Sequence, residues 1–446
     1  MFYRKIYNDL LEWKNNPDRR PLIIKGLRQI GKTTIALEFA KNEYGINNYA
    51  LLDFRANKFL KEVFDGDFNV DNIIFQLKSV FKNVNFTPNK TLLIFDEIQD
   101  CPNARSALKY FSLDGRYDII ATGSFLGISD YSNNERGIPV GFEEYLVMKP
   151  LDFEEFLKAK NQPNETFDLI KKSIKECKPL PAFLHSFLIQ EFKTYIWVGG
   201  MPKVVSTYLK SNDQRLVRKE QKFLLSAYQS DFGTHLGRDS LIETDMFAKT
   251  RINNAFLSIP AQLAKENQKF SYNVITRGAK GREYKSAIDW LCDYGLCVKC
   301  FNLSLPQLPL SNFVIDNQYK IFIADSGLYM AMLDENIVDE FLTSKLFIAK
   351  GAIFENMFAE ALNKKDLPLY YFKKESGLEI DFIISGKNEA KLVEIKAKSG
   401  RTQSSSTIIS DYSKYHVSEL IKFSENNICK INNGINYPYY LISFVL

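Results

Sequence analysis

The sequence has no long uncharged apolar run, few cysteines and no large excess of either charge, and each absence excludes a class of protein. A membrane helix needs about 20 consecutive apolar residues, and no stretch of this chain reaches that length without a charge. The N-terminal residues MFYRKIYNDLLEWK carry charges too early for a secretory signal. The sequence therefore predicts a cytoplasmic protein without a membrane partner.

The cysteines and the charge balance exclude two further classes. Six cysteines without regular spacing do not make a disulfide framework in 446 residues. Cys297 and Cys300 have a C-x-x-C spacing, but they lie in an expected strand, where a separation of three places side chains on opposite faces, and we assign no metal to them. A net charge of +5 is too mild to indicate a nucleic-acid binder, so any basic surface must be local.

A phosphate-binding loop is predicted near the N-terminus, where an apolar strand, a glycine-bounded loop and a helix follow one another from Pro21. The pattern G-x-x-x-x-G-K-[ST] runs from Gly26 to Thr33, and its glycines let successive backbone N–H groups point at phosphate oxygens. We expect Lys32 to contact the β- and γ-phosphates and Thr33 to ligate Mg²⁺. The predicted nucleotide-binding residues of this loop are Gly26, Leu27, Arg28, Gln29, Ile30, Gly31, Lys32, Thr33 and Thr34.

A pair of acids follows the apolar run TLLIFDEIQ, which is typical of a strand buried on both faces of a parallel sheet. Asp96 and Glu97 end this strand at the edge where open α/β sheets bind ligands. We expect Asp96 to hold the Mg²⁺ shell and Glu97 to orient or deprotonate the attacking water. Together with Lys32, these acids are the predicted catalytic residues of an ATPase.

The next apolar run, YDIIATGS, ends in small hydroxyl residues, and Thr122 or Ser124 is expected near the γ-phosphate. An arginine that neutralises transition-state charge is not evident, and the candidates are Arg28, Arg105, Arg116 and Arg136. The N-K-x-D segment Asn363 to Asp366, which would indicate guanine, lies far outside this unit and is better explained as a helix end. ATP with Mg²⁺ is the predicted ligand.

The segments GLRQIGKTT, LLIFDEIQD, ATGSFLG and PVGFEEYLVMKPLDFEEFL together resemble prokaryotic AAA-type ATP-binding proteins that carry a C-terminal region of uncharacterised function. The resemblance continues through YIWVGGMPKVV, YKIFIADSGL, LEIDFII and LVEIKAK. It implies ATP binding by the first part of the chain. The sequence departs from the group after PVG, where Phe142 replaces a usually basic residue.

A local basic surface is predicted in the middle of the chain. After a run of helical patterns and a VGGMP break, the order helix, turn, helix and strand indicates a winged helix. Its second helix begins with basic residues, and that end of a helix-turn-helix meets phosphates and guanine edges in the major groove. The alternatives are DNA binding and protein contacts. The basic residues are Arg277, Lys280, Arg282 and Lys285.

A second candidate site lies near the C-terminus, in two strands joined by a turn. Glu379 and Asp381 share one face of the first strand, and Glu394 and Lys396 share one face of the second. The D…E-x-K arrangement resembles the PD-(D/E)xK nuclease fold, which implies Glu355 as the helical acid and a divalent metal ion beside Lys396. The alternative is a charged face on an inactive interaction domain.

The predicted fold class is α/β, with a P-loop NTPase parallel sheet, a helical linker, a winged helix and a small nuclease-like α/β domain. The predicted domain ranges are 1–157, 158–250, 251–340 and 341–446. The leading hypothesis is an ATP-driven switch that moves DNA-binding or interaction domains. The alternatives are an ATP-gated, metal-dependent DNA nuclease and a nucleotide-controlled regulator with an inactive nuclease fold, acting on DNA, a protein partner or a second copy.

Overall fold

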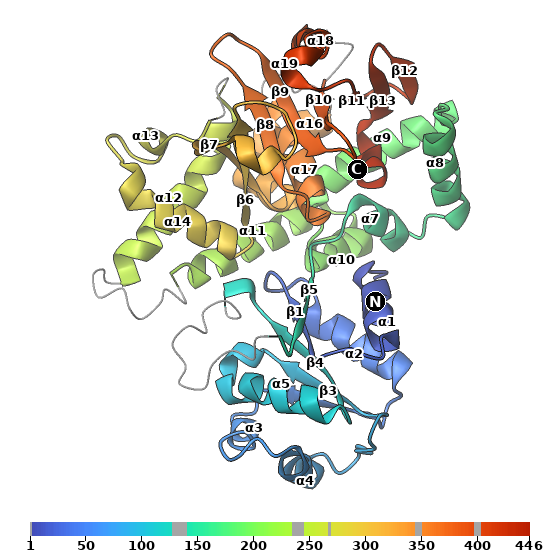
Figure 1. Cartoon of the computed structure of the whole chain (residues 1–446), viewed down its shortest axis with the longest axis vertical. Helices are drawn as coiled ribbons and strands as arrows, with labels where there is room; N and C mark the ends of the chain where they lie inside the picture. Colours follow the sequence, from blue (N-terminus) through green and yellow to red (C-terminus); the bar gives the residue numbers. More distant parts are fainter. Residues whose placement is uncertain (1, 127–140, 234–244, 266–268, 344–349, 397–402) are drawn as a thin grey trace.

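The computed structural model describes residues 2–126, 141–233, 245–265, 269–343, 350–396 and 403–446. Figure 1 shows one α/β unit at one end of the long axis, in blue to cyan, and a second at the other end, in yellow to red. Helices of the middle of the chain, in green, lie alongside the second unit. Among the described residues, no helix has the length and apolarity that crossing a membrane requires.

The N-terminal unit is built on a parallel sheet with the strand order β2-β3-β4-β1-β5. Its strands are β1 (Leu22–Lys25), β2 (Tyr49–Asp53), β3 (Leu92–Asp96), β4 (Asp118–Gly123) and β5 (Glu144–Val147). The helices around it are α1 (Ile6–Asn15), α2 (Lys32–Glu43), α3 (Phe59–Glu62), α4 (Val70–Val80) and α5 (Pro102–Asp114), with a 3₁₀ turn η1 (Ile98–Asp100).

Strand β3 shows why the sheet is apolar on both sides. Leu92 and Ile94 pack into one hydrophobic core, whereas Leu93 and Phe95 pack into the other, because successive side chains of a strand point to opposite faces. The strand is fully buried along its length. The prediction of a strand covered on both faces, ending in Asp96, is confirmed.

The middle of the chain is helical, as predicted. It contains α7 (Phe153–Ala159), α8 (Asn164–Glu176), α9 (Ala182–Val198), α10 (Pro202–Ser211), α11 (Gln214–Asp231), α12 (Asp245–Leu263), α13 (Tyr272–Ile275) and α14 (Gly281–Asp293). The break between α9 and α10 requires glycine: a Cβ on Gly199 would lie 2.4 Å from Asp325 Oδ1, and one on Gly200 would lie 2.1 Å from Leu151 O.

The C-terminal sheet is mixed and has the strand order β12-β13-β11-β10-β9-β8-β6-β7. Its strands are β6 (Cys297–Leu303), β7 (Val314–Ile323), β8 (Leu369–Lys373), β9 (Glu379–Ser385), β10 (Ala390–Ile395), β11 (Leu420–Ser424), β12 (Cys429–Ile431) and β13 (Gly434–Pro438). The accompanying helices are α15 (Ser326–Met332), α16 (Glu335–Leu342), α17 (Lys350–Lys364), α18 (Gln403–Ser410), α19 (Tyr412–Tyr415) and α20 (Ile442–Val445), with 3₁₀ turns η2 (Leu310–Phe313) and η3 (Tyr439–Leu441).

This sheet crosses the predicted boundary at residue 340. The helices α12 and α14 are followed by the hairpin β6–β7, as the winged-helix pattern predicts, but β6 also pairs in parallel with β8 through Cys300 and Leu369. The hairpin therefore belongs to the C-terminal sheet and is not a freestanding wing. A pairing between strands that lie more than 60 residues apart cannot be predicted from local sequence patterns.

Candidate nucleotide site

The loop between β1 and α2 has the backbone shape that its glycines suggest. Gly31 has a φ of 93° and Gln29 a φ of 64°, so the chain turns through the left-handed region twice before α2 begins. A Cβ on Gly26 would lie 2.4 Å from the carbonyl oxygen of Met148, which follows β5. Glycine is therefore required at both ends of the loop by its backbone contacts and conformation.

Lys32 is folded back onto this loop. Its Nζ donates to the carbonyl oxygens of Gly26 at 3.0 Å and Leu27 at 2.8 Å, and the residue is 5% exposed. Burial lowers the pKa of the amine to about 8, although the carboxylates of Glu97 and Asp96 favour the charged form. The site thus holds a buried amine whose protonation changes near neutral pH.

Asp96 lies directly across from the loop. Its Oδ1 accepts hydrogen bonds from Thr33 Oγ1 at 2.6 Å and from Thr122 Oγ1 at 2.5 Å. The Thr122 hydroxyl also accepts a hydrogen bond from the backbone N–H of Glu97 at 3.2 Å. The structure therefore brings the three predicted residues Thr33, Asp96 and Thr122 into one hydrogen-bonded group, which we call the hydroxyl–carboxylate group.

Two side chains that the sequence did not predict as site residues, those of Arg55 and Gln99, contact Glu97. Its Oε2 accepts from Gln99 and lies 3.7 Å from Nη2 of Arg55, whose Nε is 3.0 Å from Asp100. Glu97 itself has a φ of 53°, a left-handed conformation that is uncommon outside glycine and often found at functional sites. Arg55 comes two residues after β2, so the parallel order of β2 and β3 could have indicated this contact.

The arginines considered above have separate partners. Arg28 Nη1 lies 2.6 Å from Asp231 of α11, Arg105 forms a buried pair with Glu143 at 2.9 Å, and Arg116 pairs with Asp114 at 2.7 Å. Arg136 lies outside the described residues. Phe142, where the resemblance suggests a basic residue, has its ring 5.5 Å from Nζ of Lys109.

A cavity of about 380 Å³ opens beside the loop. Thr34 and Gly31 form one wall, and residues of the N-terminal segment and α10 form the others. The lining is mainly apolar and consists of Phe2, Arg4, Ile30, Gly31, Thr34, Ile35, Met148, Pro202 and Ser206.

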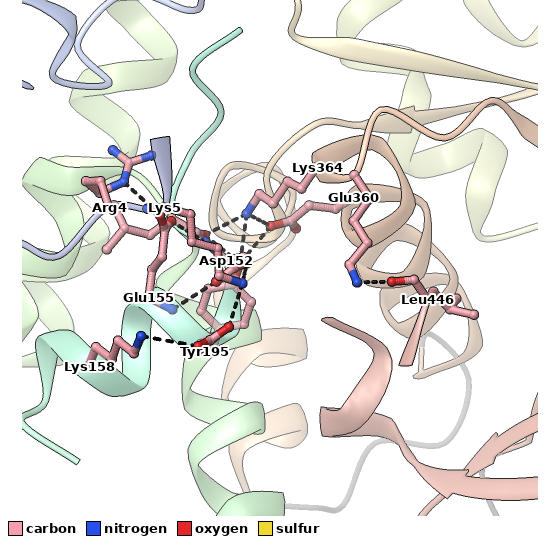
Figure 2. Close-up of polar contacts among 12 residues, drawn as sticks. Arg4, Lys5, Asp152, Glu155, Lys158, Tyr195, Glu360, Lys364 and Leu446 are labelled. Atoms are coloured by element: carbon pink, nitrogen blue, oxygen red, sulfur yellow. Dashed lines mark hydrogen bonds and ion pairs between the residues drawn. The ribbon is translucent and has the colours of Figure 1, made fainter. Parts of the chain in front are cut away.

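Polar contacts of Arg4 connect the loop to the rest of the molecule. Arg4 donates from Nη1 to Ile30 O of the loop at 3.3 Å. Through Nε it pairs with Glu155 at 3.3 Å (Figure 2). Glu155 and Asp152 form the capping box that begins α7. The loop is therefore linked through one buried arginine to the first helix that follows the N-terminal sheet.

Helix α17 contacts the same region, where the N-terminal unit leads into α7. Lys364 Nζ donates to Leu151 O and to the Tyr195 hydroxyl, each at 2.7 Å, and it pairs with the buried Glu360 (Figure 2). Leu151 directly precedes the α7 capping box. The N-terminal unit, α9 and α17 thus meet in one polar network.

The basic start of α14 is exposed, as predicted. Within the described residues, none of its four cations forms an ion pair, although Glu283 follows in the same turn. These residues, which we call the basic helix start, are Arg277, Lys280, Arg282 and Lys285. Asn363 and Lys364 lie at the end of α17, so the helix-end interpretation of the segment from Asn363 to Asp366 is confirmed.

The C-terminal candidates lie close together. Phe382 pairs with Val393 in the β9–β10 ladder, which places Asp381 opposite Glu394. Lys396 Nζ is 3.8 Å from Asp381 Oδ2 and 3.4 Å from Glu394 Oε2, while Asp381 Oδ2 also accepts from the N–H of Ile395 at 2.7 Å. Glu394 is only 2% exposed, so the alternative of a solvent-exposed charged face does not hold at this position.

The fourth candidate, Glu355 of α17, contacts a lysine that the sequence did not single out. Lys320 of β7 lies 3.3 Å from Glu355 Oε2 and 3.7 Å from Glu379 Oε1, and Glu379 also pairs with Lys373 at 2.6 Å. In the part of the chain that the structure describes, no group of three or more His, Cys, Asp or Glu residues is arranged to hold a metal ion.

The parallel sheet, the loop between β1 and α2, and Asp96 at the end of the neighbouring strand β3 define a P-loop nucleotide-binding domain. Residues 18–157 match the family model described as an AAA domain, and the N-terminal part of the chain is an AAA-type ATP-binding domain. Residues 189–337 and 350–440 match two models that are each described as a domain of unknown function, DUF8612 and DUF4143.

Comparison with curated proteins gives no match. Among solved structures, the Aeropyrum pernix ORC2 protein in its ADPNP-ADP complexes is 15% identical, with a TM-score of 0.35 over 76% of this chain and 92% of that chain. DnaA from Aquifex aeolicus bound to AMPPCP is 14% identical, with a TM-score of 0.24 over 66% of this chain and 90% of that chain. Cdc6p from Pyrobaculum aerophilum is 12% identical, with a TM-score of 0.26 over 76% and 93%.

Proposed function

We propose that this protein is an ATP-hydrolysing switch in which the nucleotide bound to the AAA domain sets the position of the basic helix start and the C-terminal sheet. The observation that supports this most strongly is the hydroxyl–carboxylate group of Thr33, Asp96 and Thr122 across from the loop. One carboxylate and a hydroxyl at the mouth of a phosphate-binding loop are hard oxygen ligands suited to Mg²⁺. Thr33 and Asp96 are the residues proposed to hold it.

The remaining residues of the site have distinct proposed roles. A bound Mg²⁺ neutralises negative charge on the phosphates. Lys32 exchanges its two carbonyl partners for anionic phosphate oxygens, which are stronger acceptors. Glu97, released from Arg55 and Gln99, orients the attacking water, and Thr122 fixes the backbone of Glu97. Thr34 and the apolar cavity beside Gly31 accommodate the adenosine part of ATP.

Two contacts made by the loop itself are the proposed route to the rest of the protein. The carbonyl of Arg28 accepts from the hydroxyl of Tyr228 at 2.9 Å, and its guanidinium pairs with Asp231, both on α11. Asp231 in turn accepts from the hydroxyl of Tyr294, at the end of α14, at 2.7 Å. A change in the loop on binding ATP therefore acts directly on the two helices that precede the C-terminal sheet.

DNA is the proposed partner of the basic helix start. Four exposed cations gathered on one helix end, in a chain with only a mild overall charge, indicate a local anionic partner. Affinity for a DNA duplex should depend on whether ATP or ADP is bound, and it should fall steeply with salt. If DNA affinity is equal in both nucleotide states, the nucleotide does not control DNA binding. The partner that the switch controls would then be a protein.

The competing proposal is an ATP-gated nuclease, and the convergence of Asp381, Glu394 and Lys396 favours it. It requires cutting of single- or double-stranded DNA that depends on Mg²⁺ or Mn²⁺ and is lost in both Asp381→Ala and Lys396→Ala. The ion pair of Glu355 with the buried Lys320, which already neutralises one of the carboxylates, counts against it. If no DNA is cut under these conditions, the nuclease proposal is rejected and the ATP switch remains.

The experiment that tests the leading proposal is an ATPase assay with and without duplex DNA. Wild type should hydrolyse ATP, Lys32→Ala should neither bind nor hydrolyse it, and Glu97→Gln should bind ATP without turnover. Asp71→Asn, which changes an exposed carboxylate paired with Arg116, serves as a control that should leave both properties unchanged. Full turnover in Glu97→Gln removes Glu97 from its proposed role.

A further inference from the structure

Lys320 is a buried cation inside a group of carboxylates. We call Glu355, Glu379, Asp381 and Glu394 the acidic cluster. Lys320 begins on β7, at the edge of the sheet, and its Nζ lies 5.0 Å from the ring centroid of Tyr371 on β8 and 3.7 Å from Glu379 on β9. The side chain therefore runs across the face of the sheet beneath α17, and it is 2% exposed.

The amine is charged despite this burial. Burial by itself disfavours the ammonium form, but the carboxylates of Glu355, Glu379 and Asp381 outweigh it and raise the pKa of Lys320 above its usual value. A buried ammonium that lacked such partners would be strongly destabilising. The lysine and the acidic cluster therefore depend on each other.

We propose that the Lys320 ammonium is the resident cation of the acidic cluster and that it takes the place of the divalent ion that nuclease chemistry would need there. Among the described residues, the four carboxylates face three ammonium groups, those of Lys320, Lys373 and Lys396, which leaves one net negative charge within this set. A divalent ion at Asp381 and Glu394 would reverse this charge and lie near two fixed cations. The described part of the wild-type cluster is consequently close to neutral without a metal ion.

The proposed role of the cluster is to stabilise the packing of the C-terminal sheet against α17. Lys320 ties β7, the strand that closes the hairpin after α14, to Glu355 of α17 and Glu379 of β9. These three elements come from opposite sides of residue 340. The inference does not rest on the ATP switch: it supports the interpretation of this region as a nuclease-like fold without metal-dependent activity, and it holds whether or not the N-terminal domain hydrolyses ATP.

Removing the lysine should create the metal site that wild type lacks. In Lys320→Met the described residues of the cluster carry two net negative charges, and Glu394 Oε2, which has an ion pair with Lys396 but no hydrogen bond among the described residues, can ligate a divalent ion beside Asp381. Lys373→Met removes the same charge from a more exposed pair with Glu379 and is the matched control. The double variant Lys320→Met/Asp381→Asn should lose whatever the single variant gains.

The experiment measures Mn²⁺ binding to the nucleotide-free full chain by calorimetry, together with the thermal unfolding temperature at increasing Mn²⁺. Wild type, Asp381→Asn and Lys373→Met should show the same weak, unsaturable response. Lys320→Met should bind one Mn²⁺, and its unfolding temperature should rise by about 3 °C when free Mn²⁺ is about 100 times its Kd. The double variant should show no rise.

Two outcomes overturn the proposal. One is saturable binding of Mn²⁺ by wild type that Asp381→Asn abolishes, because the cluster would then take a metal ion with Lys320 in place. The other is a folded Lys320→Met protein that gains no Asp381-dependent Mn²⁺ site. If Lys320→Met does not fold, the comparison of wild type with Asp381→Asn decides, and Lys320→Arg, which keeps the charge, should fold and remain without the site.

Discussion

Raising the pH through 8 should weaken ATP binding, because the buried amine of Lys32 loses its proton near that pH in the nucleotide-free protein. Its pKa is lowered from 10.5 to about 8 by burial. The triphosphate binds the charged form, so above this pH each ATP that binds must be accompanied by a proton. At pH 9 about one tenth of the amines are charged, and the affinity should be about tenfold lower than at pH 7.

The same shift affects stability, and the sign follows from the two pKa values. An unfolded lysine keeps a pKa of about 10.4. Between pH 8 and 10 the unfolded state therefore binds more protons than the folded state. The contribution of Lys32 to the free energy of unfolding consequently rises with pH in this range. Below about pH 8 the buried charge costs about 3 kcal/mol. Lys32→Met removes this cost and two hydrogen bonds of about 1 kcal/mol each, so it should stabilise the protein by about 1 kcal/mol while abolishing ATP binding.

The assay is a titration with a fluorescent ATP analogue between pH 7 and 9.5, with proton uptake measured by calorimetry in two buffers of different ionisation enthalpy. Lys32→Arg is the control, because a guanidinium stays charged throughout and its affinity should not change with pH. Wild-type affinity that is constant from pH 7 to 9.5, or binding at pH 9 without proton uptake, refutes the argument.

Three further predictions concern single residues. Glu97→Gln should lower the single-turnover rate of ATP hydrolysis by at least about 100-fold with the Kd for ATP unchanged, and an unchanged rate would contradict the proposed base. Arg105→Ala should lower the free energy of unfolding by about 3–5 kcal/mol in chemical denaturation, because it leaves Glu143 buried without its partner, and a loss under about 1 kcal/mol would contradict the buried ion pair. The pair Arg282→Ala and Lys285→Ala should each reduce the salt dependence of DNA binding, the slope of log K against log salt, by about 1; slopes equal to wild type would place the DNA elsewhere.

The N-terminal site was predictable because its signals are local. The loop from Gly26 to Thr33 is continuous in sequence, and Asp96 ends an apolar strand, so strand periodicity and the parallel order of βαβ units bring them to one edge. The hydrogen bond from Thr122 to Asp96 follows from the same order, since β4 neighbours β3. The catalytic and binding roles of these residues remain predictions.

What the sequence did not indicate depends on contacts between distant segments. Arg55 reaches Glu97 because β2 and β3 end together, and although the parallel order of these strands brings Arg55 to this edge, it does not distinguish Arg55 from its neighbours as the partner of Glu97. Lys320 stands in the buried half of β7 and finds its partners on α17 and β9, across two intervening strands. The burial of Glu394 and the continuation of the sheet across residue 340 have the same origin.

The most direct test of the nucleotide site is equilibrium binding of ATP to wild type and Asp96→Asn, each with and without Mg²⁺. If Thr33 and Asp96 hold the ion against a triphosphate on the loop, wild type should bind one ATP per chain more tightly with Mg²⁺, and Asp96→Asn should lose most of this Mg²⁺ dependence. Equal binding of ATP by both proteins, with the same response to Mg²⁺, would contradict the account.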